Sequence, residues 1–383
     1  MSTTLIISFN DLGKQFRLLR HAKSFLSKPD SNVIIVGMDQ TTLPKEIERA
    51  PNFRHIYFYN FLNLFWYFKL ILFPLRVLFS LFQLLFIVFR LPKIDYILMN
   101  QNEFSLFTFV SIKLLVFLTK GKLILDITSI GYISKNRMIK VLEKSFIKNA
   151  YKRICSTKSL QAILKLSNIE SFVIYDSPGT IFKNCSSIKT EVLRFLGRKE
   201  DNVYIISIPF PEMNATIVRN IVHYFKQFES SGVNISFLIY GDFKIQKTVE
   251  NFFSNDQSSS HVQFHFISLN TDAYAHALGC SDACIIFKGS LSGTNISPEF
   301  TESYASNIPI IAYKFGCMSE LIKNGENGFI FSDFDELINY IQQIFIYKTI
   351  DLNLLKKKSE ENIKFNWIDS WNLFYKTLQN DML

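Results

Sequence analysis

This 383-residue sequence lacks an uncharged apolar run long enough to span a bilayer. Its most apolar segment, residues 61–91, is free of charge for at most thirteen residues, 77–89, whereas a spanning helix needs about twenty. A long basic block and an aromatic RNA-binding signature are also missing, which argues against nucleic acid as a partner. No internal repeat or low-complexity tract occurs, so we do not expect a repeat architecture.

Cysteine is scarce and has no metal-binding pattern. The five cysteines form an odd number, and Cys280 and Cys284 lie four residues apart without a second pair at similar spacing. Because a closed zinc site needs four ligands, we expect no metal. Most of the cysteines lie in apolar patterns, which favours reduced thiols in a cytosolic setting.

The composition combines positive charge with many apolar residues. The formal net charge is +9, and phenylalanine alone contributes 39 residues. This combination favours anionic partners, and an acidic membrane surface fits it better than nucleic acid. The length allows two domains, each with its own core.

The apolar segment 61–91 predicts a helix that lies in the membrane interface. Lys69, Arg76, Gln83 and Arg90 recur at intervals of seven, so they form one polar stripe on a helix. The residues that we predict to contact the membrane are Trp66, Lys69, Arg76, Leu78, Phe82, Leu85, Phe89 and Arg90. The alternative is a very hydrophobic core helix. Residues 104–118 favour a core helix, and we expect no signal peptide, since strand-like residues 3–9 start the chain.

Short β-rich runs alternate with helical patterns along the whole chain. This alternation predicts parallel sheets wrapped by helices, an α/β fold with doubly wound, Rossmann-like domains. The polar residues 184–202 indicate a boundary between them. We therefore predict a first domain at residues 1–190, a second at 191–365, and a terminal helix at 366–383 that packs back across the first domain.

Residues 278–331 carry the clearest functional pattern. An apolar strand ending at Phe287 leads into a loop with Lys288, Gly293 and Asn295, and a helix follows near Pro298. In an open α/β sheet, ligands bind at the carboxyl ends of strands, where helix N-termini attract phosphates. A sugar nucleotide would place its diphosphate on the helix start and its ribose hydroxyls on Glu302. The alternative is that the glutamates of this helix only complement its dipole.

Several motifs match one family in order and spacing over most of the chain. They comprise residues 11–21, 125–132, 142–146 and 173–182 in the first half, and residues 292–302, 309–328 and 367–371 in the second. The pattern resembles GT-B glycosyltransferases, and in detail the chitobiosyldiphosphodolichol beta-mannosyltransferase family.

The resemblance implies a GT-B fold whose two domains face a cleft, and an inverting hexosyltransferase. It would move mannose from GDP-mannose to a dolichol-linked chitobiosyl diphosphate, on the cytosolic face of the endoplasmic reticulum membrane, in N-glycan precursor assembly. No metal cofactor is required in such an enzyme, and other glycosyltransferases of the same pathway would be partners. The first domain would hold the acceptor, and the second would hold the donor.

The resemblance also assigns roles to residues. Asp11 and Asp126 become candidates for the catalytic base, although either could instead brace a loop. The candidates for acceptor or diphosphate binding are Gly13, Lys14 and Arg17. The candidates for donor binding are Gly241, Lys288, Gly293, Asn295 and Glu302.

Some positions depart from the family. The family has a histidine after the strand that here ends at Asp126, and this chain has Thr128 in its place. The family's Gly-Lys-Gly turn is replaced by a segment that contains Asp242. The family's lysine before the acidic residue is replaced by Glu299. Lys288 is a candidate for the missing cation. The departures leave two alternatives open, a non-catalytic binding or scaffold subunit of a glycosylation complex, and a membrane-bound polysaccharide glycosyltransferase with another acceptor.

The sequence Asp333-Phe334-Asp335 matches a metal-binding motif of the other glycosyltransferase fold. It directly precedes a helical pattern, however, and an aspartate there is typical of a helix N-cap. We predict a cap and no metal at this position.

Overall fold

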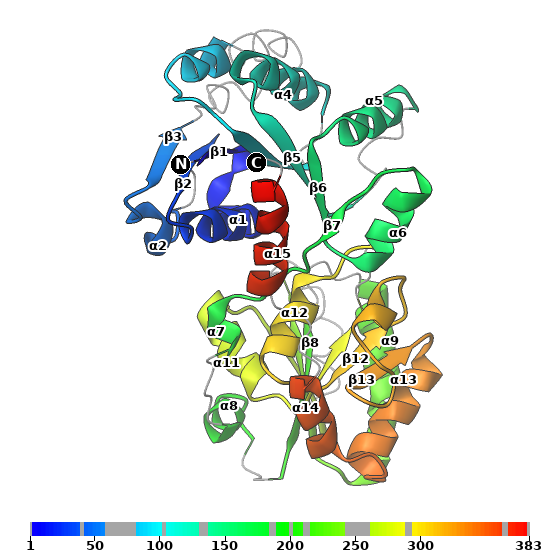
Figure 1. Ribbon diagram of the computed structural model, residues 1–383. Helices are drawn as coiled ribbons and strands as arrows, with labels where there is room; N and C mark the ends of the chain where they lie inside the picture. Colours follow the sequence, from blue (N-terminus) through cyan, green and yellow to red (C-terminus); the bar gives the residue numbers. More distant parts are fainter. Residues whose placement is uncertain are drawn as a thin grey trace, which may run out of the picture. The chain divides into compact units, whose positions relative to one another are not determined.

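The structure is a computed structural model, and it describes residues 2–38, 42–57, 82–101, 105–129, 137–183, 189–198, 202–209, 215–241, 261–287, 293–361 and 367–380. The chain divides into two compact units (Figure 1). One consists of Met1–Tyr175 with Trp367–Leu383, and the other of Asp176–Asn366.

The N-terminal unit is built on a parallel sheet in the order β3-β2-β1-β4-β5-β6-β7. Its strands are β1 (Ser2–Asp11), β2 (Ser31–Met38), β3 (Phe53–Tyr57), β4 (Tyr96–Asn100), β5 (Lys122–Ile127), β6 (Lys152–Cys155) and β7 (Phe172–Val173). The strand order reverses between β1 and β4. In this class of sheet, such a switch point is where ligands bind.

Both faces of this sheet are covered. Side chains alternate along a strand, so Leu5 and Ile7 of β1 face one core and Ile6 faces the other. The first core includes the helix at residues 82–88, α4 (Leu106–Thr119), α5 (Arg137–Lys148) and α6 (Lys158–Leu166). The second includes α1 (Phe16–Leu26), α2 (Lys45–Glu48) and α15 (Trp367–Asn380). Burial on both faces explains the apolar runs in the central strands, such as residues 5–7 of β1 and 96–99 of β4.

The C-terminal unit repeats this architecture with a parallel sheet in the order β10-β9-β8-β11-β12-β13. Its strands are β8 (Tyr204–Pro209), β9 (Ile235–Tyr240), β10 (Val262–Ile267), β11 (Ala283–Ile286), β12 (Ile310–Tyr313) and β13 (Gly328–Phe331). The helices α9 (Ala215–Phe225), α13 (Phe334–Ile341) and α14 (Leu352–Glu361) contribute to one core, and α8 (Lys189–Phe195) and α11 (Thr271–Gly279) to another. The strand order reverses between β8 and β11. The predicted pair of doubly wound, Rossmann-like domains is therefore confirmed.

The division between the units falls at Tyr175, before the polar stretch where we predicted it. The short helix α7 (Thr180–Lys183) contacts α11 and α12 (Pro298–Ala305), both in the C-terminal unit. In α8, Leu193 shares a core cluster with Ile205 and Ala277. The described part of this polar stretch, α8, thus belongs to the second unit.

The terminal helix α15 is part of the N-terminal unit. Trp371, Phe374 and Leu378 are buried in the core that also contains α1. The Oη of Tyr96 donates a hydrogen bond of 3.2 Å to the carbonyl oxygen of Leu378. The chain therefore returns to its first unit after it completes the second.

The predicted membrane segment is described only in part. Trp66, Lys69, Arg76 and Leu78 lie outside the described residues. Among the others, Phe82, Phe89 and Arg90 are exposed and Leu85 is half-buried, while Leu84 and Ile87 pack against the sheet. No helix within the described ranges is both long and apolar enough to cross a bilayer.

Candidate functional site

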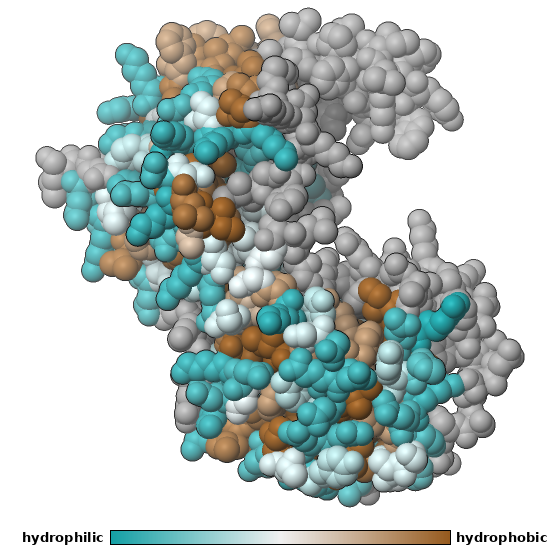
Figure 2. All heavy atoms as spheres, turned by 90° about the vertical axis from the view of Figure 1, so that its right-hand side faces the viewer, coloured by the Kyte–Doolittle hydropathy of each residue, from teal (hydrophilic) through white to brown (hydrophobic). Residues whose placement is uncertain are grey.

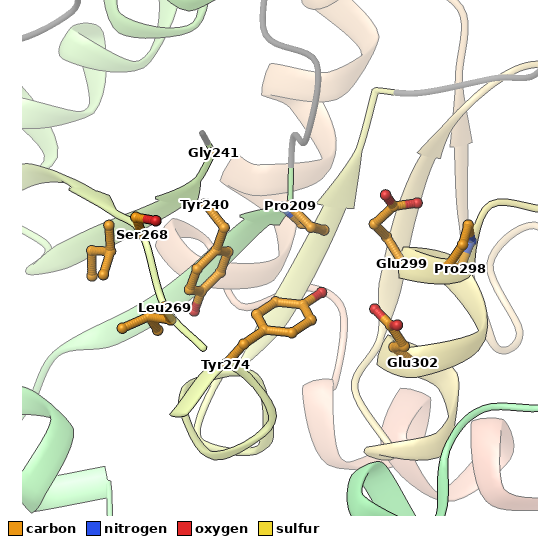
Figure 3. A pocket seen from close by; sticks show the side chains of 10 residues that line it. Pro209, Tyr240, Gly241, Ser268, Leu269, Tyr274, Pro298, Glu299 and Glu302 are labelled. Carbon is orange, nitrogen blue, oxygen red and sulfur yellow. The ribbon is translucent and has the colours of Figure 1, made fainter. Parts of the chain in front are cut away.

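A cavity of about 330 Å³ lies at the carboxyl ends of strands in the C-terminal unit, beside the switch point between β8 and β11. It is lined by Pro209, Tyr240, Gly241, Ile267, Ser268, Leu269, Tyr274, Pro298, Glu299 and Glu302 (Figure 3). Ligand pockets typically enclose roughly 300–1,000 Å³, so a small molecule or part of a larger one fits here.

Helix α12 presents two carboxylates to this cavity. Pro298 occupies its first turn, where a fixed φ and a missing N–H cost nothing, and the side chain of Ser297 does not cap the helix. Glu299 and Glu302 lie one turn apart, and Figure 3 shows both side chains directed from α12 toward Pro209 and Tyr274. The cavity therefore combines hydrogen-bond acceptors with the positive end of a helix dipole.

Glu299 is 9% exposed, and its Oε2 has no hydrogen-bond partner among the residues that the structure describes. A buried carboxylate oxygen is costly unless it accepts hydrogen bonds. The side chain is also directed into the cavity rather than into the core. Glu299 is thus positioned to accept hydrogen bonds from a ligand.

Two tyrosines form the opposite part of the cavity. Burial raises the pKa of Tyr240, and its Oη lies 3.1 Å from the Oγ of Ser207. Burial, and then the charge of Glu302, raise the pKa of Tyr274. The rings lie edge to face with their centroids 5.0 Å apart. Both hydroxyls stay protonated near neutral pH and can donate as well as accept hydrogen bonds.

Gly293 lies in the loop before α12 and has a φ of +65°, which favours glycine. A Cβ on Gly316, in the loop after β12, would lie 2.7 Å from the carbonyl oxygen of Gly293. The two loops therefore touch through their backbones. Gly293 has a structural reason to be glycine, whether or not a donor binds beside it.

In the N-terminal unit, three of the predicted residues lie at the end of β1 or directly after it, beside its switch point with β4. Asp11 ends β1 and is 9% exposed, and Gly13 and Lys14 belong to the 3₁₀ turn Leu12–Lys14. This placement agrees with an acceptor-binding position at a carboxyl edge. The side chain of Lys14 lies outside the described residues.

Arg17 and Asp126 are paired with each other instead of facing solvent. The Nε of Arg17 donates to Oδ2 of Asp126 at 2.7 Å, and its Nη2 donates to Oδ1 at 3.0 Å and to the carbonyl oxygen of Ile174 at 2.9 Å. Asp126 is fully buried and Arg17 is 7% exposed. Our predictions of a phosphate-binding Arg17 and a basic Asp126 both require access to a ligand, and this pairing favours the alternative role of bracing.

The electrostatics of Asp126 agree with this role. Burial raises the pKa of its carboxyl group, but the charge of Arg17 and the hydrogen bonds from His21 and Arg17 outweigh burial and hold the pKa at about 2. A carboxylate with so low a pKa is a weak proton acceptor.

His21 connects this pair to the terminal helix. The Nε1–H of Trp371 donates to Nδ1 of His21 at 3.2 Å, and Nε2 of His21 lies 3.3 Å from Oδ2 of Asp126. Since an indole N–H only donates, Nδ1 is an acceptor here, and a proton on Nε2 completes the contact with Asp126. The guanidinium of Arg17 also lies 5.3 Å from the ring centroid of Trp367. The cluster ties α1, β5 and α15 together.

Several other predicted positions can now be placed. Gly241 follows β9 and lines the cavity, and Asn295 lies half-buried in the loop before α12. Thr128 follows β5, and its buried Oγ1 has no hydrogen-bond partner among the described residues. Lys288 and Asp242 lie outside the described residues.

The capping prediction for Asp333 is confirmed. The Oδ1 of Asp333 accepts a hydrogen bond of 2.9 Å from the backbone N–H of Glu336 at the start of α13. This contact accounts for the acidic residue without a metal ion.

The fold agrees with comparisons to known proteins. No protein-family model matches the chain. It is 22% identical over 469 aligned residues to the chitobiosyldiphosphodolichol beta-mannosyltransferase of Dictyostelium discoideum, covering 99% of this chain and 93% of that one. It is 24% identical to the protein of the same name in Kluyveromyces lactis, covering 96% and 87%. The resemblance seen in the motifs thus extends over nearly the full chain.

Solved structures support the architecture. The Anabaena protein HepE in complex with UDP has a TM-score of 0.71 and 14% identity, covering 99% of this chain and all of that chain. A glycosyltransferase from Rickettsia africae has a TM-score of 0.70 and 17% identity, covering 98% and 97%. The fold is GT-B.

The sequence did not lead us to the tyrosines of the cavity. Tyr240 ends an apolar strand and Tyr274 lies three residues into α11, so each is typical of a core residue in its own segment. A signal was present in the topology, because Tyr240 is the last residue of β9, which neighbours β8 at the switch point. Only the order of the strands makes that position informative.

Proposed function

We propose that this chain is a hexosyltransferase that moves mannose from GDP-mannose to a chitobiosyl-diphosphate-dolichol acceptor. The reaction would proceed with inversion and without a required metal, at the cytosolic face of the endoplasmic reticulum membrane, during assembly of the N-glycan precursor. The similarity to mannosyltransferases over nearly the whole chain supports the coarser part of this proposal, a sugar transfer to a dolichol-linked acceptor. The sugar, the nucleotide and the location are the finer part.

The cavity of the C-terminal unit carries the proposal. It lies at the carboxyl edge beside the switch point, and it combines two carboxylates, two tyrosine rings and the start of α12. A nucleotide sugar carries hydroxyl groups, an aromatic base and a diphosphate. The carboxylates, the tyrosine rings and the start of α12 suit these three groups in turn. In our proposal Glu302 accepts from ribose hydroxyls, and Glu299 accepts from hydroxyls of the transferred sugar.

The acceptor would bind the N-terminal unit near the end of β1. Asp11 ends β1 at the carboxyl edge, and the pKa of Asp126 is held at about 2, which makes Asp126 a weak base. We therefore favour Asp11 as the base that removes the proton of the attacking hydroxyl. Positive charge for the departing diphosphate would come from Lys288 and from the N–H groups of the first turn of α12.

A turnover assay tests the proposal. Purified full-length protein in detergent, given GDP-mannose with radiolabelled mannose and a chitobiosyl diphosphate lipid, should form a trisaccharide lipid that carries the label. Parallel reactions with labelled UDP-glucose and UDP-N-acetylglucosamine ask whether the nucleotide and sugar are right. Product formation that persists in EDTA would agree with a metal-independent reaction.

Each remaining possibility has its own outcome. Binding of GDP-mannose in calorimetry without any product would indicate the non-catalytic scaffold, whose partners would be other glycosyltransferases of the pathway. Transfer only to a different lipid acceptor would indicate the polysaccharide enzyme. If a UDP-sugar alone supports transfer, the proposed donor is wrong while the proposed reaction class stands.

A further inference from the structure

A second cavity, of about 440 Å³, lies in the N-terminal unit. One wall is the edge strand β3, with Arg54, Ile56 and Tyr57, and the other belongs to residues 82–90, with Phe86 and Arg90. None of the described residues that line it is an aspartate or a glutamate. The cavity shares no residue with the proposed donor site or with the predicted acceptor residues after β1.

The two arginines of this cavity have no carboxylate partner in the described part of the chain. Both Arg54 and Arg90 are exposed, and neither forms an ion pair with any described residue. The guanidinium of Arg90 lies 4.0 Å from the ring centroid of Phe86. Stacking on the ring orders the guanidinium and leaves its N–H groups able to bind an anion in the plane.

The exposed aromatic side chains beside the cavity favour a phosphate that belongs to a lipid. Phe82, Phe86 and Phe89 follow the i, i+4, i+7 spacing of one helix face and are 67%, 50% and 84% exposed. Tyr57, on the other wall, is 48% exposed. A free phosphate would gain nothing from four exposed aromatic side chains, whereas a headgroup in a bilayer brings apolar chains to them.

The charge of this region is one-sided in the sequence as well. Residues 49–94 contain six lysines and arginines and no aspartate or glutamate. Helix α4 also has no acidic residue, and its Phe117 and Val110 are 77% and 45% exposed. Figure 2 shows hydrophobic side chains gathered at the end of the N-terminal unit where α4 lies. An acidic membrane complements such a surface in both charge and polarity.

We propose that the cavity between β3 and residues 82–90 binds the phosphate headgroup of an acidic phospholipid, with Arg54 and Arg90 as its ligands. The phenylalanines beside it enter the interface between headgroups and acyl chains. This inference rests on the proposed membrane association, but it is independent of which sugar is transferred. It adds β3 to a membrane contact that the sequence placed only in residues 61–91.

Vesicle flotation with the full-length protein tests the site. The wild type should float with vesicles of phosphatidylcholine and phosphatidic acid and bind vesicles of phosphatidylcholine alone more weakly. Each basic residue near an acidic surface strengthens binding about fivefold, so R54Q/R90Q should lower affinity for the acidic vesicles about 25-fold. Its binding to neutral vesicles should change little, since the phenylalanines remain.

The matched control is K144Q/K165Q, which removes the same charge from exposed positions on α5 and α6. It should lose much less affinity for acidic vesicles than R54Q/R90Q. Equal losses in the two double variants would mean that net charge alone is responsible, and would overturn the site. F86L supplies a second check, because removing the ring beneath Arg90 should weaken acidic binding several-fold without any change in charge.

The transferase reaction separates this inference from the proposed function. With a short-chain acceptor in detergent, R54Q/R90Q should keep the activity of the wild type, because the reaction then needs no bilayer. An inactive wild type that still prefers acidic vesicles would refute the transferase and support the lipid site. Soluble glycerol phosphate should compete only weakly, because it has no acyl chains to contact the phenylalanines. If it binds as tightly as the acidic vesicles do, the site is one for free phosphate esters and the lipid assignment is refuted.

Discussion

Replacement of Asp126 by asparagine distinguishes a bracing carboxylate from a catalytic base. The change leaves the guanidinium of Arg17, which is only 7% exposed, without its counter-charge. Removing one partner of a buried ion pair costs about 3–5 kcal/mol, a large part of the roughly 5–15 kcal/mol that holds a typical protein folded. We expect D126N to destabilise the N-terminal unit by an amount in that range.

The assay can be made specific to that unit. All three tryptophans belong to it, and Trp367 and Trp371 pack beside the Arg17–Asp126 pair. Urea unfolding followed by tryptophan fluorescence therefore reports on the N-terminal unit alone. A loss of less than about 1 kcal/mol in D126N would refute the reasoning, because that is the value expected for an exposed pair.

The double variant R17M/D126L removes both charges and keeps apolar volume in their place. Since no unpaired charge is left, it should be more stable than D126N. If Asp126 only braces α1 and α15, this variant should retain most of the transferase activity measured with the wild type. If Asp126 is the base, activity should fall by orders of magnitude even though the fold survives.

The pH dependence of the unfolding free energy tests the same ion pair independently. The pKa of Asp126 is about 2 in the folded chain, below its usual value near 3.9. Its stabilising contribution is therefore complete above pH 4 and is lost as the pH falls from about 4 to 2. Over this range the unfolding free energy of D126N should decline less steeply than that of the wild type.

Three further predictions concern the C-terminal unit. In E302Q, loss of a charge-assisted hydrogen bond to the ribose should weaken GDP-mannose binding roughly 10-fold in calorimetry. In E299Q, binding should weaken while the melting temperature of the free protein rises; tighter binding would show that Glu299 repels the donor. Burial, and then the charge of Arg198, lower the pKa of His265 to about 4, so this residue favours the folded state most above pH 6.5. Its contribution should be lost as the pH falls from 6.5 to 4, and circular dichroism melts of H265Q should depend less on pH over that range.

The sheets were predictable from sequence because their strands are short apolar runs between turn signals. The runs at residues 5–9, 33–38 and 203–208 lie in β1, β2 and β8 with small differences at the ends. Burial on both faces forces these segments to be apolar throughout, and this signal needs no tertiary information. The helix that begins at Pro298 was equally clear, because Pro298 and the acidic residues behind it mark a helix start.

The pairing of Arg17 with Asp126 was not predictable in the same way. The two residues are 109 positions apart, and each alone is typical of a surface or active-site residue at a strand edge. Burial of both depends on α15, whose Trp367 lies against Arg17 and whose Trp371 contacts His21. A sequence pattern shows local periodicity, but it does not show which distant helix covers a given charged residue.

Glu299 departs from the family pattern, yet its environment argues for retained ligand binding. Its Oε2 is buried without a partner in the described residues, and an unsatisfied charged group costs about 1–3 kcal/mol or more. A protein that served only as a scaffold would gain stability from almost any apolar residue at this position. A ligand with hydroxyl donors removes the cost by completing the hydrogen bonds, so the free protein bears a penalty that the bound state does not. The rise in melting temperature expected for E299Q measures that penalty, and the loss of donor affinity measures what the carboxylate contributes in return.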